Sequence, residues 1–311
     1  MATKVFIDGE YGTTGLQIQK RLAERSDFKL LSLPHTDRHN IDMRQDCFDQ
    51  TDIAILCLPD KAARETVNKL KNNKKIRIID SSTAHRIAPD WVYGFPEMTA
   101  GQKKRIQEAR YVTNPGCYPI GAISLIRPLR ESGLLDAYYP ISINAISGYS
   151  GGGKQLIEQM ENQSLQNDIL ENYFMYGLNL DHKHVPEIKI HAQIKKTPIF
   201  VPSVGRFSQG MLVNVPLHRS LFTKSVNCSN LREIFEKHYN RQNTISIASQ
   251  EETETLTKLN PECLAHKDDM KLFVFANERE GIFNLCAVLD NLGKGASATA
   301  VQNLDLMLLK S

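Results

Sequence analysis

The feature that most constrains the fold is the alternation of short apolar runs with amphipathic helical stretches along the N-terminal part of the chain. Residues 5–9 have the pattern of a buried strand that runs into glycine, and residues 16–23 continue as a helix. Apolar runs at 29–33, 52–58 and 76–80 follow, separated by helical segments. This alternation predicts an α/β domain with a Rossmann-type, doubly wound parallel sheet, in which ligands bind at the carboxyl ends of the strands.

Three glycines, Gly9, Gly12 and Gly15, follow the first strand at three-residue spacing. Glycines at such a turn let the backbone approach a pyrophosphate at the start of a helix. The spacing is GxxGxxG, not the commoner GxGxxG, and a turn that needs positive φ and binds nothing is the alternative. We predict that these glycines, with Thr13 and Thr14 between them, contact a dinucleotide.

The end of the second strand indicates which dinucleotide. An NAD enzyme usually has an acidic residue there, on the ribose hydroxyls. In this chain Asp37 comes late, whereas Ser32, His35 and Arg38 suit a 2′-phosphate. The pattern therefore favours NADP(H) over NAD, with a solvated basic loop as the alternative. Further candidate cofactor contacts, at the ends of the next strands, are Pro59, Ser81 and Ser82.

Cys117 is the candidate nucleophile. It lies in the sequence Asn-Pro-Gly-Cys-Tyr-Pro, between a short strand that ends at Thr113 and an apolar pattern of helical spacing. The start of a helix has free N–H donors and a partial positive charge, so we expect the pKa of this thiol to be well below that of free cysteine. The same N–H groups suit a developing oxyanion. A buried, inert cysteine is the alternative.

The pattern changes after this helix. Residues 141–146 alternate like a strand with one exposed face, and 272–277 and 282–288 have the pattern of paired strands. We therefore expect an NADP-binding domain of residues 1–116, completed by a C-terminal helix within 291–311 that returns to it. Residues 117–290 are expected to form an α+β catalytic domain.

Two segments of the second domain are candidates for binding and proton transfer. The glycine-rich run 147–154 ends in lysine and can wrap an anionic group, with a flexible linker as the alternative. His182, His184 and Glu187 suit acid/base chemistry and substrate binding better than a metal site, because their spacing is not HExxH. A plain surface loop is the alternative. Arg206 is a candidate anion clamp or a solvated loop arginine.

The composition of the chain indicates which classes of partner and which cellular compartment to expect. The net charge of +3 is nearly balanced, so it gives no reason to expect nucleic acid or an anionic membrane as a partner. The six cysteines are scattered, without a CxxC pair, which indicates a reducing environment. The first predicted strand begins at Lys4, which leaves no room for a leader, and no apolar run approaches the length of a membrane span. We therefore expect a cytoplasmic protein.

The motifs together resemble a known family. The Asn114–Pro119 turn, the glycine-rich loop from Gly148 and the His182–Glu187 stretch occur in that order, with Asp80–Arg86, Tyr93–Glu97 and Asn291–Ala296 around them. This set resembles the N-acetyl-γ-glutamyl-phosphate reductases of the shorter bacterial type, which are similar in fold and chemistry to the aspartate-semialdehyde dehydrogenases. The resemblance extends over essentially the whole chain.

The resemblance implies a reaction and its residues. It implies that Cys117 forms a thioester from an acyl phosphate, that NADPH reduces the thioester to an aldehyde in arginine biosynthesis, and that the protein is a homodimer or homotetramer. His184 or Glu187 would be the acid/base group and His182 a substrate contact. The remaining assignments are Gly148, Gly151 and Asn291 to the cofactor, and Arg86, Asn114, Ser147, Lys154 and Arg206 to the substrate.

Two other functions fit parts of the pattern. One is an NADP-dependent reductase of another acyl phosphate, such as aspartyl phosphate, against which the His182–Glu187 stretch argues. The other is a non-catalytic dinucleotide-binding redox sensor, which would not need Cys117 at a helix start.

Overall fold

The computed structural model describes residues 2–162 and 169–309, and the chain divides into two compact units. Unit 1 consists of the chain up to Pro96, Ala100–Gly116 and the residues from Ala296 onward. Unit 2 consists of Glu97–Thr99 and Cys117–Gly295. The division differs from the expected bounds at residues 97–99 and 291–295, which belong to unit 2. Glu97 and Lys294, both in unit 2, form an ion pair.

Unit 1 contains a six-stranded sheet of order β2-β1-β3-β4-β6-β5, with parallel pairing throughout. This is the doubly wound parallel sheet that the alternation of strands and helices predicts. The strands are β1 (Thr3–Asp8), β2 (Phe28–Leu31), β3 (Ile53–Leu56), β4 (Arg77–Asp80), β5 (Val92–Tyr93) and β6 (Tyr111–Thr113). The helices are α1 (Thr13–Leu22), α2 (Ile41–Asp49), α3 (Asp60–Leu70), α4 (Gln102–Glu108) and α10 (Ala298–Leu308), with a 3₁₀ turn at His35–Asp37.

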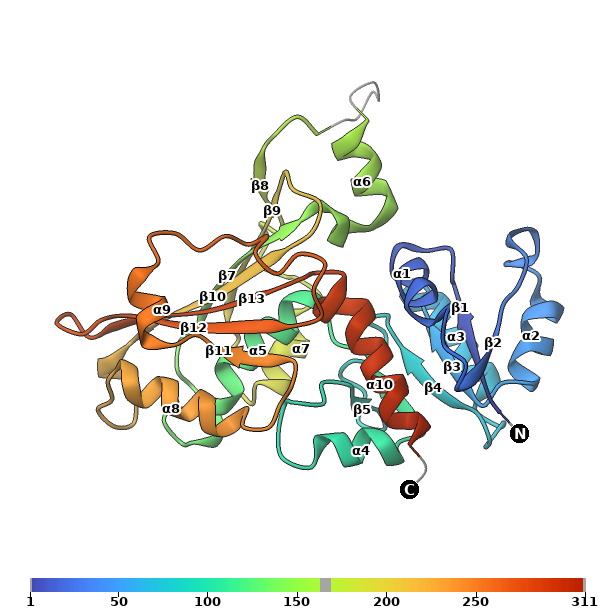
Figure 1. Ribbon diagram of the computed structural model, residues 1–311, viewed down its shortest axis with the longest axis horizontal. Coiled ribbons are helices and arrows are strands. Elements are labelled where there is room, and N and C mark those ends of the chain that lie inside the picture. The colour runs from blue at the N-terminus through green and yellow to red at the C-terminus, as the bar shows by residue number, and fades with distance from the viewer. Residues whose placement is uncertain (1, 163–168, 310–311) are drawn as a thin grey trace. The chain divides into compact units, whose positions relative to one another are not determined.

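Apolar side chains cover both faces of this sheet, which explains the continuous apolar runs in its central strands. Val5 and Ile7 of β1 pack with residues of α1 and α10 in one core cluster. Phe6, which points to the opposite face, packs with residues of α2 and α3 in another. Helix α10 contacts α4 and α1 (Figure 1), so the prediction that the C-terminal helix returns to the first domain is confirmed.

Unit 2 is built on a seven-stranded mixed sheet of order β11-β12-β13-β10-β7-β9-β8. Helix α5 contacts β10 and β13, and α7 and α8 pack against α5, so these helices cover one face of the sheet. The α+β prediction is therefore confirmed. The strands are β7 (Ser142–Gly148), β8 (Tyr173–Met175), β9 (Ile199–Gly205), β10 (Met211–His218), β11 (Ile245–Ile247), β12 (Met270–Asn277) and β13 (Ile282–Leu289). The helices are α5 (Cys117–Glu131), α6 (Gly153–Glu161), α7 (Val185–His191), α8 (Cys228–His238) and α9 (Gln250–Thr255), with 3₁₀ turns at Tyr149–Gly152 and Arg219–Leu221 and a π-helical turn at Gly293–Ser297.

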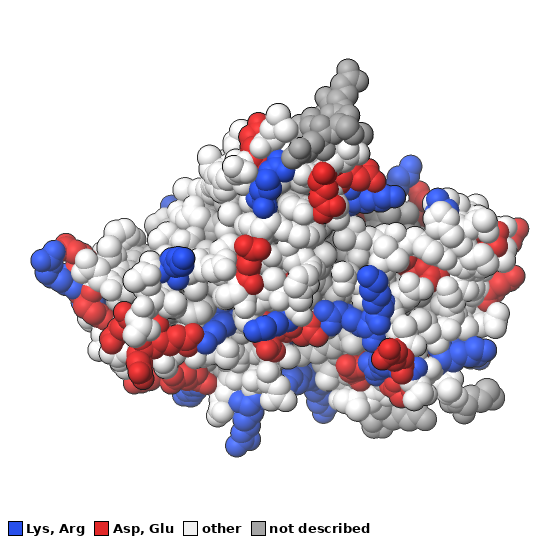
Figure 2. All heavy atoms as spheres, turned by 45° about the horizontal axis from the view of Figure 1, so that its top comes forward, with Lys and Arg blue, Asp and Glu red and all other residues white. Residues whose placement is uncertain are grey.

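The surface carries charges of both signs. Figure 2 shows lysines and arginines interspersed with aspartates and glutamates over the face that it draws. Among the residues that the structure describes, no helix has both the length and the apolar character needed to cross a membrane.

Candidate active site

The glycine turn of unit 1 has the shape that a dinucleotide requires. Gly9 has a φ of +91°, and a Cβ there would lie 2.4 Å from the carbonyl oxygen of Cys57. A Cβ on Gly15 would lie 2.2 Å from the carbonyl oxygen of Gly9. Gly12 precedes α1, which begins at Thr13 and has no side-chain cap at that end. The turn therefore leaves the N–H groups at the start of α1 open to a phosphate, so these residues fit the pyrophosphate of a dinucleotide.

Glu10 is a buried carboxylate in this turn whose role the sequence pattern did not reveal. It is 3% exposed and accepts hydrogen bonds from the Ser32 hydroxyl at 2.8 Å, the Leu33 backbone N–H at 3.1 Å and the Gln19 side chain at 3.0 Å. Glu10 therefore ties the glycine turn to the end of β2. The single hydroxyl proton of Ser32 is donated to Glu10, so Ser32 has no proton left for a 2′-phosphate in this arrangement.

Arg38 provides the cationic group at the end of β2. Its Nη1 donates to the backbone carbonyl of His35 at 2.6 Å and lies 3.0 Å from Nδ1 of the same histidine. The His35 ring meets the ring of Tyr11 edge-on, with centroids 4.7 Å apart. The Tyr11 hydroxyl donates to the Leu33 carbonyl at 2.8 Å. A partly exposed guanidinium beside the His35 ring fits a phosphate-bearing ribose and its base.

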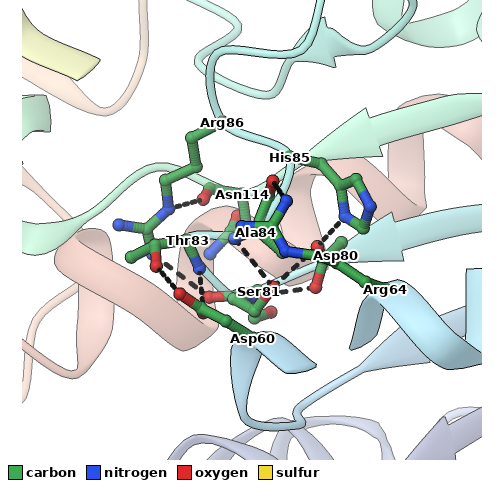
Figure 3. A network of polar contacts seen from close by, with 10 residues as sticks. Asp60, Arg64, Asp80, Ser81, Thr83, Ala84, His85, Arg86 and Asn114 are labelled. Carbon is green, nitrogen blue, oxygen red and sulfur yellow. Dashed lines mark hydrogen bonds and ion pairs between the residues drawn. The ribbon is translucent and has the colours of Figure 1, made fainter. Parts of the chain in front are cut away.

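A polar network fixes the loop after β4 (Figure 3). Asp80 is fully buried and accepts from the Ser82 N–H at 2.9 Å and the Ser82 hydroxyl at 2.8 Å, and its carboxylate lies 2.6 Å from Nδ1 of His85. Thr83 donates its N–H to Asp60 at 2.9 Å, at the start of α3, which Pro59 precedes. Ser82 and Pro59 therefore lie on rigid backbone at the carboxyl edge of the sheet, where the sequence places the cofactor.

Arg86 lies in the same network (Figure 3), 8% exposed. Its Nε donates to the Asn114 carbonyl at 3.0 Å and its Nη2 to the Ser81 carbonyl at 3.1 Å. The Asn114 side chain donates to the Ala296 carbonyl at 2.9 Å. These bonds brace the loop that leads to Cys117 from within unit 1. The predicted role of Arg86 in phosphate binding stays a prediction.

In unit 2, Cys117 is the first residue of α5, as the sequence predicts. Next to it, Tyr118 is 3% exposed and donates its hydroxyl to the Ser203 carbonyl at 3.0 Å. The Tyr118 ring belongs to an aromatic cluster, with centroid distances of 5.9 Å to His184, 6.3 Å to His182 and 5.4 Å to Phe200. The start of α5 is therefore adjacent to the predicted histidine stretch within one unit.

Tyr176 completes the aromatic cluster, and the sequence analysis did not single it out. Its ring centroid lies 5.6 Å from that of His182. Burial raises the pKa of the Tyr176 hydroxyl to about 12, and the charge of Cys117 contributes in the same direction. A lone tyrosine in an irregular segment has no sequence signal of this kind.

The two histidines have different environments. Nδ1 of His182 accepts the backbone N–H of His184 at 3.1 Å, so the proton of neutral His182 is on Nε2. Burial, followed by the charge of Lys183, lowers the pKa of His182 to about 4, so this ring is neutral at pH 7. His184 and Glu187, at the start of α7, are 7% and 1% exposed. A neutral Nε2–H donor suits contact with a substrate oxygen, whereas a group with so low a pKa is a weak general base.

The glycine-rich loop is held inside unit 2. A Cβ on Gly148 would lie 2.4 Å from the Ser208 carbonyl oxygen. Asn291, 1% exposed, accepts the Gly210 N–H at 2.9 Å and donates to the Ser150 hydroxyl at 3.0 Å. A Cβ on Gly151 would lie 3.2 Å from the Asn291 side chain. The side chain of Asn291 therefore positions this loop, and any contact of Asn291 with a cofactor stays a prediction.

The remaining predicted residues of this region differ in exposure. Ser147 is 3% exposed and donates its hydroxyl to the Gly148 carbonyl at 3.0 Å. The side chain of Lys154 is 84% exposed and lies 3.9 Å from Glu158. Their substrate contacts stay predictions.

Arg206 is engaged with backbone carbonyls. Its Nη1 donates to Met160 at 2.8 Å, its Nε to Glu171 at 3.3 Å, and its Nη2 to Ile169. These bonds give the guanidinium a bracing role next to β9, while the predicted role as an anion clamp stays a prediction. Within residues 2–162 and 169–309, no group of three or more His, Cys, Asp or Glu side chains is arranged to hold a metal ion.

Comparisons with known proteins cover both units. Residues 4–106 match the family model of the semialdehyde dehydrogenase NAD-binding domain, and residues 117–291 match that of the semialdehyde dehydrogenase dimerisation domain. The chain is 55% identical, over 310 residues and 100% of both chains, to the N-acetyl-gamma-glutamyl-phosphate reductase of Brucella suis (strain ATCC 23445 / NCTC 10510). It is 54% identical over the same length to that of Brucella anthropi.

Solved structures show the same fold at low sequence identity. Aspartate semialdehyde dehydrogenase II from Vibrio cholerae matches with a TM-score of 0.77 and 17% identity, covering 99% of both chains. Aspartate semialdehyde dehydrogenase with NADP from Candida albicans matches with a TM-score of 0.69 and 12% identity, covering 99% of this chain and 98% of that one.

Proposed function

Because the chain belongs to the N-acetyl-γ-glutamyl-phosphate reductase family, we propose that it reduces N-acetyl-γ-glutamyl phosphate to N-acetylglutamate 5-semialdehyde and phosphate, with NADPH, in arginine biosynthesis. The structural observation that carries this proposal is Cys117 at the first residue of α5, adjacent to a largely buried aromatic cluster that contains His182 and His184. Such an arrangement provides a nucleophile and a proton-transfer group in one unit.

Cys117 begins the reaction. Its thiolate attacks the acyl carbonyl carbon of the substrate, the C–O bond to the phosphate breaks, and the product is a thioester with release of phosphate. The N–H groups in the first turn of α5 stabilise the thiolate and the oxyanion that forms. When bound, NADPH would supply the hydride that reduces the thioester to the aldehyde, with the electron pair of the C–S bond returning to the sulfur of Cys117.

The residues of the His182–Glu187 stretch have two different roles in the proposed reaction. We assign His182, with its proton on Nε2, to a hydrogen bond with a substrate oxygen, since its low pKa makes it a weak base. His184 or Glu187, both buried at the start of α7, takes the role of acid/base group. Tyr176 and Tyr118 belong to the same cluster, each with its ring against that of His182.

The cofactor residues are those of the glycine turn and the end of β2. The N–H groups at the start of α1 hold the pyrophosphate, and Arg38 with His35 holds the 2′-phosphate. Pro59, Ser81 and Ser82 present fixed backbone at the same edge of the sheet. We place the enzyme in the cytoplasm as a homo-oligomer. Its six cysteines are all free, which fits a reducing compartment, and the match to a dimerisation domain supports self-association.

The reverse reaction tests the proposal. N-acetylglutamate semialdehyde, phosphate and NADP are supplied, and NADPH formation is followed by absorbance, with aspartate semialdehyde and NAD run in parallel. We expect a phosphate-dependent signal with the first substrate, lost in Cys117→Ala and retained in the matched control Cys263→Ala, which changes an exposed cysteine. No signal with N-acetylglutamate semialdehyde, or a stronger one with aspartate semialdehyde, would refute the assignment. Full activity in Cys117→Ala would refute the thioester mechanism.

A further inference from the structure

Unit 2 contains a fully buried ion pair that the proposed reaction does not use. The Lys294 ammonium lies 3.1 Å from the Glu97 carboxylate, and both side chains are 1% exposed. Lys294 also donates to the Thr244 hydroxyl at 2.9 Å, and that hydroxyl donates to the same Glu97 oxygen at 2.6 Å. Burial lowers the pKa of Lys294, an effect that Glu97 opposes. The three groups therefore form a closed triangle of hydrogen bonds.

The next residue along the chain is in contact with the nucleophile. A Cβ on Gly295 would lie 2.9 Å from Cβ of Cys117 and 3.3 Å from its Cα, so the backbone of Gly295 packs directly against Cys117. The Gly295 N–H donates to the Asp290 carbonyl at 2.8 Å. The Asp290 side chain accepts the N–H groups of Leu292 and Gly293 at 2.7 Å and 2.8 Å. Asp290 therefore fixes the backbone at Leu292, Gly293 and Gly295, and the side-chain bonds of Lys294 fix the residue between Gly293 and Gly295.

A contribution to folding stability alone does not account for a buried ion pair. Replacing such a pair with apolar side chains of similar size is often neutral for folding, because desolvation of two charges offsets their attraction. The ion pair differs from an apolar pair in that its hydrogen bonds are directional. The ammonium and the carboxylate hold their partners at defined distances and angles, which apolar contacts do not. Such directional bonds are relevant at Gly295, because the Gly295 backbone packs against Cβ of Cys117.

We propose that Lys294 and Glu97 are positioning residues for the nucleophile: their ion pair holds the Gly295 backbone against Cα and Cβ of Cys117 and so keeps the thiol in place at the start of α5, where the helix N-terminus stabilises a thiolate. The proposal rests on the proposed function only in taking Cys117 as the nucleophile. It makes no use of the cofactor or the substrate, so a test on the free enzyme is available.

The test compares Lys294→Met, the double variant Glu97→Gln/Lys294→Met and the milder Thr244→Val with a matched control. The control is Lys271→Met, which breaks a pair with Glu252 at 2.6 Å between side chains that are 30% and 40% exposed. Alkylation of Cys117 by iodoacetamide is measured by peptide mass spectrometry at pH 6.5 and pH 9.5 on folded protein. The kcat and KM of the reductase reaction are measured on the same samples.

We expect the Cys117 alkylation rate of Lys294→Met to fall roughly fivefold at pH 6.5 and to change less than about twofold at pH 9.5, because a sulfur that leaves the helix start loses thiolate stabilisation. We expect kcat to fall about tenfold or more at nearly constant KM, since small displacements of a reacting atom have large effects. Thr244→Val should give a smaller change in the same direction, and Lys271→Met none.

Two results would overturn the proposal. One is a folded Lys294→Met or double variant with the alkylation profile and kcat of the wild type. The other, should both of those variants fail to fold, is a folded Thr244→Val with a wild-type profile. If the wild type alkylates as expected but does not reduce the acyl phosphate, the proposed function fails while the alkylation profiles still decide the role of Lys294.

Discussion

Lowering the pH should destabilise the folded chain through His182. Burial lowers the pKa of His182 from its ordinary value of 6.5 to about 4, with Lys183 contributing. In the unfolded chain the ring is in water and binds a proton below about pH 6.5. Between these two values the unfolded state binds more protons than the folded state. The free energy of unfolding therefore falls as the pH drops from 6.5 to about 4, and the contribution of His182 is constant below that.

The magnitude follows from the two pKa values. At about 1.36 kcal/mol per pH unit, the difference between 6.5 and about 4 corresponds to at most roughly 3.4 kcal/mol. His182 is only partly buried, and screening by water reduces such an effect. We therefore expect a loss of about 1–2 kcal/mol between pH 7 and pH 4 that belongs to this residue.

Urea unfolding of the wild type and His182→Gln, followed by the fluorescence of the single tryptophan, measures this contribution. Both proteins are compared at several pH values from 7 to 4.5 and at one protein concentration, because self-association would make stability depend on concentration. We expect the stability difference between wild type and His182→Gln to shift against the wild type as the pH falls. His39→Gln, at an exposed position, is the control and should follow the wild type at every pH.

A stability difference that is independent of pH, or that shifts in favour of the wild type on acidification, would refute this reasoning. Either result would mean that His182 is protonated at least as easily in the folded chain as in water. The assignment of His182 to a neutral hydrogen-bond donor, and of proton transfer to His184 or Glu187, would then lose its basis.

Further changes test other parts of the site. At pH 7, iodoacetamide should label Cys117 first. Cys57 and Cys286 should stay unlabelled until the protein unfolds, because burial raises the pKa values of their thiols to about 12. Equal labelling of the three cysteines in native protein would contradict this prediction. Arg38→Ala should raise the KM for NADPH roughly tenfold and leave that for NADH nearly unchanged, since only NADPH has the 2′-phosphate, and an equal effect on both would argue against that contact. Arg206→Ala should lower the free energy of unfolding by about 2 kcal/mol, because it removes charged donors from carbonyl groups. The KM for the acyl phosphate should be little changed, and a raised KM at full stability would instead support the role of an anion clamp.

The local sequence predicted much of the fold because the relevant forces act over short distances in the chain. The apolar run of β3 and the alternation of β7 are consequences of which faces of a strand are buried. The glycine turn is predictable because Gly9 needs a positive φ and Gly15 has no room for a side chain. The position of Cys117 at a helix start follows from the turn residues around it.

Other features of the same turn could not be predicted from the local sequence. Glu10 is an ordinary glutamate by sequence, yet its carboxylate accepts a hydrogen bond from the hydroxyl of Ser32, a residue that the pattern alone assigned to the cofactor. Arg206 has the residue type of an anion clamp, but its three donor groups reach backbone carbonyls near α6. A sequence states how many hydrogen bonds a side chain can make, and only the folded chain decides which partners use them.

The amino-acid sequence by itself therefore determined the α/β class, the glycine turn, the place of Cys117 at a helix start and the family, since each depends on short-range periodicity, turn chemistry or ordered motifs. Only the tertiary structure decided that Tyr176 joins the histidine cluster and that Lys294 pairs with Glu97, 197 residues away. Such pairs depend on where distant segments meet in the folded chain. The local sequence pattern around each residue therefore does not predict them.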